Sequence, residues 1–353
     1  MLVLIARDVV IPCPGSDREV EQMRRREFIT LLGGAAASPV AWPLAARAQG
    51  RRVRHVGVLM GTAESDRLGQ IRLREFRLEL RRLGWIDGDS VRIDERWSAD
   101  DLSLVRAHAA EMASSNADVI LVTAARIVPI MQQATRTIPI VFTAVSDPVG
   151  AGFVTSLARP GGNTTGFSGM EYSVVGKLLE ALKQIAPDVA RVAHLFNPDN
   201  PSSSAYYRSF AASASSIGVA PIAAPVHTPA DIERAIATVA REPNGGLLLT
   251  PDATSGNNRE LIFALASRHR LPAVYSSREF VTEGGLISYG PNLPDLYRRA
   301  AAYVDRILKG EKPADLPVQQ PIKYELILNL KTAKALGIEV PTVVLLRADE
   351  LVE

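Results

Sequence analysis

Residues 56–61 read Val-Gly-Val-Leu-Met-Gly. A short apolar run that stops at a glycine predicts a strand buried on both faces of a parallel sheet. The next segment has apolar residues at helical spacing, and Gly84 ends it. These residues lie on one face of the predicted helix: Leu73, Phe76, Leu80 and Leu83. A strand, a turn and an amphipathic helix make one β-α unit.

The same alternation repeats along most of the chain. Strands are predicted over 91–97, 118–123 and 138–145, and helices over 102–112 and up to about 136. The alternation restarts after a turn-rich segment, 159–166. Strands are then predicted over 192–196, 219–223, 247–249 and 273–275, and helices over 174–185, 202–217, 229–241 and 258–269. The pattern indicates an α/β protein of two doubly wound parallel-sheet lobes with a ligand cleft between them.

The last part of the chain is interrupted by prolines. A predicted helix over 297–309 ends at Gly310, and Pro313, Pro317 and Pro321 follow. Proline breaks regular structure, so these stretches suit crossings between lobes. We expect lobe 1 to hold residues 53–168 and about 291–322. Lobe 2 then holds residues 169–290 and about 323–353.

The composition excludes several classes of protein. The chain has 353 residues, of which 47% are hydrophobic, enough for two lobes with cores of their own. A net charge of +2 gives no reason to expect a nucleic-acid partner. The single cysteine, Cys13, lies upstream of the predicted lobes, and the five histidines are far apart in sequence. We therefore expect no disulfide, no metal site and no cofactor.

Residues 24–48 have the features of an export signal. Residues 24–29 read Arg-Arg-Arg-Glu-Phe-Ile, 31–37 are weakly apolar, and Ala-Arg-Ala at 46–48 fits signal peptidase. We expect cleavage after residue 48 and release into the periplasm, with no lipid anchor because no cysteine follows. The paired arginines resemble a twin-arginine signal, and the general secretory route is the alternative. Met23 directly precedes the arginines and is the expected start, in which case residues 1–22 are an upstream extension; Met1 is the alternative start.

Several segments, in this order, resemble one family. They read Ile-Pro-Ile-Val-Phe (138–142) with Asp-Pro (147–148), Leu-Ala-Arg-Pro-Gly-Gly-Asn-Thr-Thr-Gly (157–166), Gly-Leu-Ile-Ser-Tyr-Gly (285–290), Ile-Leu-Lys-Gly-Glu-Lys-Pro-Ala-Asp-Leu-Pro-Val (307–318) and Asn-Leu-Lys-Thr-Ala-Lys-Ala-Leu-Gly (329–337). The chain is thereby similar to ABC transporter substrate-binding proteins that include tryptophan- and tyrosine-binding members.

The resemblance implies the periplasmic-binding-protein type I fold, with two lobes that close on a ligand. It also implies capture of an amino acid or related small carboxylate, and delivery to an ABC importer permease. Where family members often carry a glycine and a proline, this chain has Ala124, Ala125 and Arg126 after Thr123. Arg126 either contacts the ligand instead or points to solvent.

Topology selects the candidate ligand-binding residues. Loops that follow parallel strands meet at one edge of a sheet, where ligands bind. The candidates share that position: Thr62, Thr123, Ala124, Ser146, Asp147, Asn197, Asp252 and Ser276. Hydroxyls and helix amino ends suit a carboxylate, whereas Asp252 suits an ammonium group.

Each polar candidate also has a structural alternative. Asp147 and Asn197 precede prolines and suit turns, and Asp252 could cap a helix that begins near residue 257. Tyr206 and Tyr207 either stack on an aromatic ligand or pack in a helix.

The motifs of the competing functions are absent from the sequence. There is no Gly-x-Gly-x-x-Gly loop, phosphate loop or Gly-x-Ser-x-Gly elbow, so we expect no enzyme. No helix-turn-helix precedes the lobes, although a periplasmic sensor that signals to a membrane receptor stays open. We expect a monomeric solute-binding protein.

Overall fold

The computed structural model describes residues 52–353, so the predicted export signal and both possible start sites lie outside the described residues. Two sheets are present within this part of the chain. No helix of residues 52–353 is both long and apolar enough to cross a membrane.

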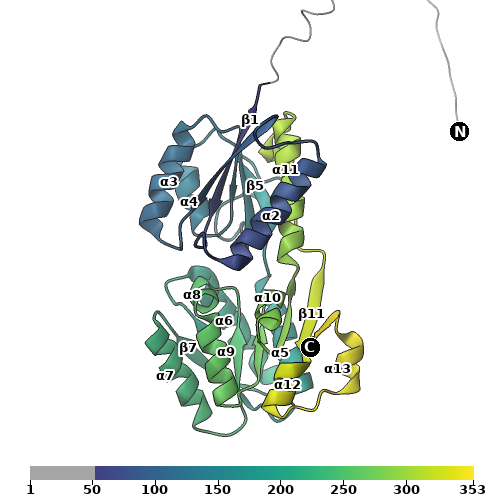
Figure 1. Cartoon of the computed structure of the whole chain (residues 1–353). Coiled ribbons are helices and arrows are strands. Elements are labelled where there is room, and N and C mark those ends of the chain that lie inside the picture. The colour runs from purple at the N-terminus through teal and green to yellow at the C-terminus, as the bar shows by residue number, and fades with distance from the viewer. Residues whose placement is uncertain (1–51) are drawn as a thin grey trace, which may run out of the picture. The chain divides into compact units, whose positions relative to one another are not determined.

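The first lobe contains a five-stranded parallel sheet in the order β2-β1-β3-β4-β5. Its strands are β1 (Arg54–Met60), β2 (Val91–Trp97), β3 (Val119–Val122), β4 (Ile140–Val145) and β5 (Thr164–Ser168). Its helices are α2 (Arg67–Arg82), α3 (Leu102–Ser114), α4 (Ile127–Ala134) and α11 (Leu293–Leu308). Helices α2 and α11 cover one face, and α3 and α4 the other (Figure 1).

Strand β1 is buried on both faces, as the sequence predicts. Val56, Val58 and Met60 pack with α2 and α11, whereas Leu59 packs with α3 and α4. Alternate side chains of a strand point to opposite faces, so an unbroken apolar run can serve two helix layers.

The second lobe contains a seven-stranded sheet in the order β12-β11-β10-β9-β8-β6-β7. Its strands are β6 (Arg191–Phe196), β7 (Ala220–Pro225), β8 (Gly245–Leu249), β9 (Ala273–Tyr275), β10 (Ile287–Pro291), β11 (Tyr324–Asn329) and β12 (Glu350–Val352). Strands β10 and β11 are antiparallel, and the other pairs are parallel.

Helices cover both faces of this second sheet as well (Figure 1). They are α5 (Val175–Ile185), α6 (Pro201–Ala214), α7 (Pro229–Ala240), α8 (Ala253–Asn257), α9 (Arg259–Arg268), α10 (Arg278–Thr282), α12 (Leu330–Leu336) and α13 (Thr342–Arg347), with 3₁₀ turns η1 (Tyr172–Val174) and η2 (Ser215–Ile217). A third 3₁₀ turn, η3 (Pro313–Asp315), lies against β5 of the first lobe. The two-lobed α/β class predicted from the sequence is confirmed.

Three segments join the lobes. The chain leaves the first sheet after β5, returns after β10 into α11, and leaves again after η3. The last crossing runs beside the first, since the Ser168 N–H donates to the Gln319 carbonyl and the Gln319 N–H donates to Gly166. The segment that contains Pro317 and Pro321 therefore lies at a junction between lobes.

One prediction was wrong: the turn-rich segment was expected to extend to Gly166, but residues 164–166 belong to β5, which spans Thr164–Ser168. The glycines and threonines there resemble a loop, but Gly166 allows β4 and β5 to approach closely. A Cβ atom at Gly166 would lie 2.2 Å from the Phe142 carbonyl oxygen and 2.6 Å from its amide nitrogen. A glycine in a strand interior often marks such an approach.

A second correction concerns the helix after β8. The helix predicted over 258–269 is α9, but a short helix that was not predicted, α8, precedes it, begins at Ala253 and has Asp252 as its N-cap. Strands β10 to β12 and helices α10 and α13 were not predicted, because they are short and flanked by prolines and glycines.

Gly166→Ala should lower the free energy of unfolding by more than about 2 kcal/mol, because the methyl group collides with backbone atoms that cannot move independently. Gly176→Ala is the control. Gly176 lies in helix α5, where a Cβ atom would be 3.9 Å from the side chain of Ser213, so this substitution should be neutral or stabilising. Urea unfolding of both variants measures the difference. Equal stabilities would show that β4 and β5 are not held at this spacing.

Candidate functional site

A cavity of about 240 Å³ lies between the two lobes. Its lobe 1 lining comes from loops after β1 to β5 and from α2. Its lobe 2 lining comes from the loops after β8, β9 and β10 and from the amino ends of α6, α8, α9 and α10. The cavity therefore lies at the carboxyl ends of parallel strands, where doubly wound sheets bind ligands.

Six of the eight sequence-selected residues line this cavity: Thr62, Thr123, Ala124, Ser146, Asp252 and Ser276. The other two do not. Asp147 accepts the Gly150 N–H at 2.8 Å, closing its own turn. Asn197 donates from its side-chain amide to Thr254 at 2.9 Å. Both fit the turn-forming alternative that a following proline suggested.

Several cavity hydroxyls hold the protein together. Thr123 accepts the Gly61 N–H at 3.0 Å and thereby fixes the loop after β1. Ser146 lies 2.8 Å from the hydroxyl of Tyr206, which in turn donates to the Met170 carbonyl. Tyr206 is fully buried, and burial raises the pKa of its hydroxyl. It packs within the second lobe and is not among the residues that line the cavity.

Asp252 has a structural task. Its carboxylate accepts the Ser255 N–H at 3.1 Å, the Ser203 hydroxyl at 2.6 Å and the Asn197 N–H at 3.2 Å. These bonds cap α8 and tie it to the loop after β6 and to α6. A carboxylate offers about four lone-pair sites, so Asp252 keeps limited capacity for a ligand.

Besides Asp252, the cavity is lined by charged residues that were not among the eight ligand-binding candidates. Three carboxylates and three guanidinium groups line the cavity: Asp66, Asp100, Asp252, Arg72, Arg126 and Arg259. The sequence left open whether Arg126 contacts the ligand or points to solvent. In the structure it lines the cavity and donates to Asp100 at 2.9 Å. Arg259 donates to Glu283 at 2.6 Å and to the Gly256 carbonyl at 2.9 Å. The lining thus presents both signs of charge.

Asp100 reaches the cavity through unusual backbone conformations. Ala99 and Asp100 have φ angles of 48° and 63°, in the left-handed region that few non-glycine residues adopt. The Asp100 N–H donates to the Gly61 carbonyl at 2.8 Å, which fastens this loop to the end of β1. Burial raises the pKa of Asp100, with a further contribution from Asp252, and Arg126 opposes both. The adjacent Asp101 caps α3 and does not line the cavity. The sequence alone gives no reason to assign the cavity to Asp100 and the cap to Asp101.

Ion pairs also join the two lobes around the cavity. Arg72 lies 3.6 Å from Glu279, Arg259 lies 3.7 Å from Asp66, and Arg67 lies 3.9 Å from Glu283. All three distances exceed that of a hydrogen bond. Only Arg67 is an exposed partner, at 76%, and an exposed pair of this kind contributes about 1 kcal/mol or less.

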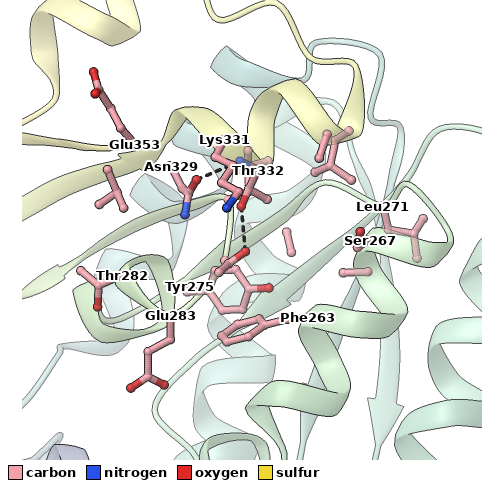
Figure 2. Close-up of a pocket in the computed structure, with 18 residues that line it drawn as sticks. Phe263, Ser267, Leu271, Tyr275, Thr282, Glu283, Asn329, Lys331, Thr332 and Glu353 are labelled. Carbon is pink, nitrogen blue, oxygen red and sulfur yellow. Dashed lines mark hydrogen bonds between the residues drawn. The ribbon is translucent and has the colours of Figure 1, made fainter.

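A second cavity, about 370 Å³, lies within the second lobe beside α9 and α12. Figure 2 shows polar groups on its wall that bond to one another. Asn329 accepts the Thr332 N–H at 2.8 Å, and the Thr332 hydroxyl donates to the Gly284 carbonyl at 2.9 Å. Phe263 and Tyr275 form part of the remaining wall. This cavity is larger, but it lies away from the loops that follow β1 to β5, so we place the functional site between the lobes.

No group of three or more histidine, cysteine, aspartate or glutamate side chains within residues 52–353 is arranged to hold a metal ion. The charged and polar side chains that line the interlobe cavity can offer hydrogen bonds and charge pairs to a ligand.

Known proteins resemble this chain over most of its length. A tyrosine-binding protein of Clostridioides difficile (strain R20291) is 27% identical over 256 residues, which are 72% of this chain and 73% of the relative. An ABC domain from Streptococcus pneumonia, solved in complex with L-Trp, is 25% identical with a TM-score of 0.79, covering 85% of this chain and 100% of its own.

A ligand-free, open substrate binding protein with adhesive properties from Clostridium difficile is 26% identical, with a TM-score of 0.66, covering 85% of this chain and 99% of its own. The model of the ABC transporter substrate binding protein family matches residues 73–352, which include both sheets from β2 onward. The chain belongs to the ABC transporter substrate binding protein family.

Proposed function

We propose that this protein captures an amino acid, or a related small carboxylate, in the interlobe cavity and delivers it to the permease of an ABC importer. The observation that carries the proposal is a cavity between two lobes lined by three carboxylates and three guanidinium groups. Such a lining complements a zwitterion, which carries both charges. The relatives named for tyrosine and for L-Trp support an amino acid with an aromatic side chain.

The proposed protein works in the periplasm as a monomer and makes no covalent change in its ligand. Substrate-binding proteins of ABC importers act outside the cytoplasmic membrane, which agrees with the export signal proposed at residues 24–48. The proposed location does not depend on whether the protein is exported by the twin-arginine or by the general secretory route.

The purified protein should carry its ligand, or bind one from a panel of the 20 standard amino acids. Native mass spectrometry identifies the co-purified compound, and calorimetry then measures its affinity. We expect micromolar binding or tighter of L-tryptophan or L-tyrosine, at about −8 kcal/mol or below. A protein that binds only neutral sugars would contradict the proposed ligand class and leave the family intact.

We propose that Asp100 and Asp252 face the ligand's ammonium group from opposite lobes. Asp100 accepts one hydrogen bond from Arg126, whereas Asp252 accepts three from its own lobe. Asp100 therefore has more free capacity, and a buried carboxylate gains most from a cation.

Asp100→Asn should weaken amino-acid binding about 10-fold or more with little change in unfolding free energy. Asp252→Asn should weaken it less, but should cost about 1 kcal/mol of stability because hydrogen bonds across its lobe are altered. The raised pKa of Asp100 adds a second measurement: on acidification, wild-type affinity should begin to fall above the pH at which a free aspartate protonates, and the Asp100→Asn variant should lack that step. Calorimetry at several pH values and urea unfolding measure both; equal losses of affinity would reject the assignment.

We also propose that the lobes close on the ligand by a hinge motion at the three joining segments. The chain resembles the L-Trp complex, at a TM-score of 0.79, more than the open ligand-free relative, at 0.66, although the sequence identities are similar. This supports a closed arrangement. The interlobe ion pairs lie beyond hydrogen-bond distance, so the ligand's own contacts with both lobes supply the free-energy difference that favours the closed state.

Small-angle scattering should therefore give a smaller radius of gyration with a saturating amino acid ligand than without it. The ligand-free protein should also become more open at high salt, because screening weakens the ion pairs. Identical profiles under all conditions would argue against closure.

A further inference from the structure

Arg72 differs from the other two arginines of the interlobe cavity. Arg126 and Arg259 both donate hydrogen bonds of normal length to carboxylates, Asp100 and Glu283. Arg72 instead approaches Glu279 of the opposite lobe at 3.6 Å, which is beyond a hydrogen bond. Its Nε is buried and has no hydrogen-bond partner among residues 52–353.

This arrangement is energetically incomplete. The Arg72 side chain is only 18% exposed, so little solvent is available to it. A guanidinium carries five N–H donors, and a buried donor without an acceptor costs about 1–3 kcal/mol. A buried arginine with an unpaired donor lowers the stability of the folded protein, unless a ligand supplies the missing acceptor in the functional state.

A second unpaired donor lies on the same side of α2. The hydroxyl of Thr62 is buried and has no hydrogen-bond partner among residues 52–353. It lies against the first turn of the helix, since a Cβ atom at Gly69 would be 2.5 Å from it. Gly69 and Arg72 are three residues apart, so they share one face of the helix. Both Thr62 and Arg72 line the cavity.

We infer that Arg72, assisted by the hydroxyl of Thr62, binds the ligand's carboxylate and makes the site specific for acids over their amides. The inference rests on the proposed function and adds the group that selects the ligand class. A guanidinium matches a carboxylate through two parallel hydrogen bonds, which a neutral carboxamide cannot reproduce. Because Arg72 also faces Glu279, a carboxylate bound there places the ligand at the junction of the lobes.

The test compares L-tryptophan and L-tyrosine with L-tryptophanamide and L-tyrosinamide, which keep the ammonium group and the ring. Binding is measured by calorimetry for the wild type, Arg72→Gln, Arg72→Lys and Arg67→Gln. Arg67 is the matched control. It lies on the same helix and faces Glu283 of the opposite lobe, but its side chain is 76% exposed and does not line the cavity.

The wild type should bind the acids at least about 10-fold more tightly than the amides. Arg72→Gln should bind acids and amides about equally, Arg72→Lys should recover only part of the preference, and Arg67→Gln should keep it. In the absence of ligand, Arg72→Gln should unfold at about the same urea concentration as the wild type, because the variant loses a long ion pair with Glu279 but also loses a buried Nε donor that has no partner among residues 52–353.

Two results would overturn the inference. An Arg72→Gln protein that keeps the acid preference would place the carboxylate elsewhere while leaving the proposed function standing. A loss of stability in Arg72→Gln, with equal weakening of acids and amides, would show that Arg72 is structural. If the wild type binds no member of the panel, the proposed ligand class itself is wrong, and the inference falls with it.

Discussion

The architecture depends on the burial of β1 between two layers of helices. Val56 and Val58 face one layer and Leu59 the other, and all three have no exposed surface. A strand covered on both faces belongs to a parallel sheet, because each connecting helix returns the chain to the same edge before the next strand begins. Every loop that follows a strand of this sheet therefore emerges at one edge.

The second sheet obeys the same constraint through β6, β8, β9 and β10, which run parallel. The interlobe cavity forms where loops from the two sheets line one space. The position of the site thus follows from strand direction. The antiparallel strand β11 comes after the last return to this lobe, and no residue of it lines the cavity.

Placement at a strand end does not by itself make a residue a ligand contact. Thr123, Ser146 and Asp252 line the cavity, yet each makes hydrogen bonds that fix a loop or a helix end. A polar group that already hydrogen-bonds to the protein has fewer donors or lone pairs left for a ligand. The residues with spare capacity are different ones: Arg72, whose guanidinium has no close acceptor, and Asp100, which has a single strong partner.

The cavity also concentrates opposite charges, and only some of them form direct pairs: Arg126 hydrogen-bonds to Asp100, whereas Arg72 has no carboxylate within hydrogen-bond distance. Three acidic and three basic side chains share its lining, and the separations across the lobes are 3.6 to 3.9 Å. In surroundings of low dielectric constant, an ion pair without direct hydrogen bonds recovers less of the desolvation free energy than a hydrogen-bonded pair does. A zwitterionic ligand would complete the hydrogen bonds that the protein leaves open, and it would do so from both lobes at once.

The sequence by itself determined the two-lobed α/β class, the order of most strands and helices, and the edge at which the site lies. The class and the order of elements follow from local periodicity, and the edge follows from the rule that β-α-β connections return each strand in the same direction. It also selected six side chains that line the cavity, because position after a strand is visible in sequence.

The tertiary structure alone decided which side chains are free to bind. Whether Asp252 is saturated depends on Ser203 and Asn197, about 50 residues away, and whether Arg72 is paired depends on Glu279 of the other lobe. Recognising β5 required the same kind of information, because the need for glycine at position 166 arises only from the close approach of the Phe142 backbone. Hydrogen-bond satisfaction and close backbone approach are relations between distant segments, and no local pattern encodes them.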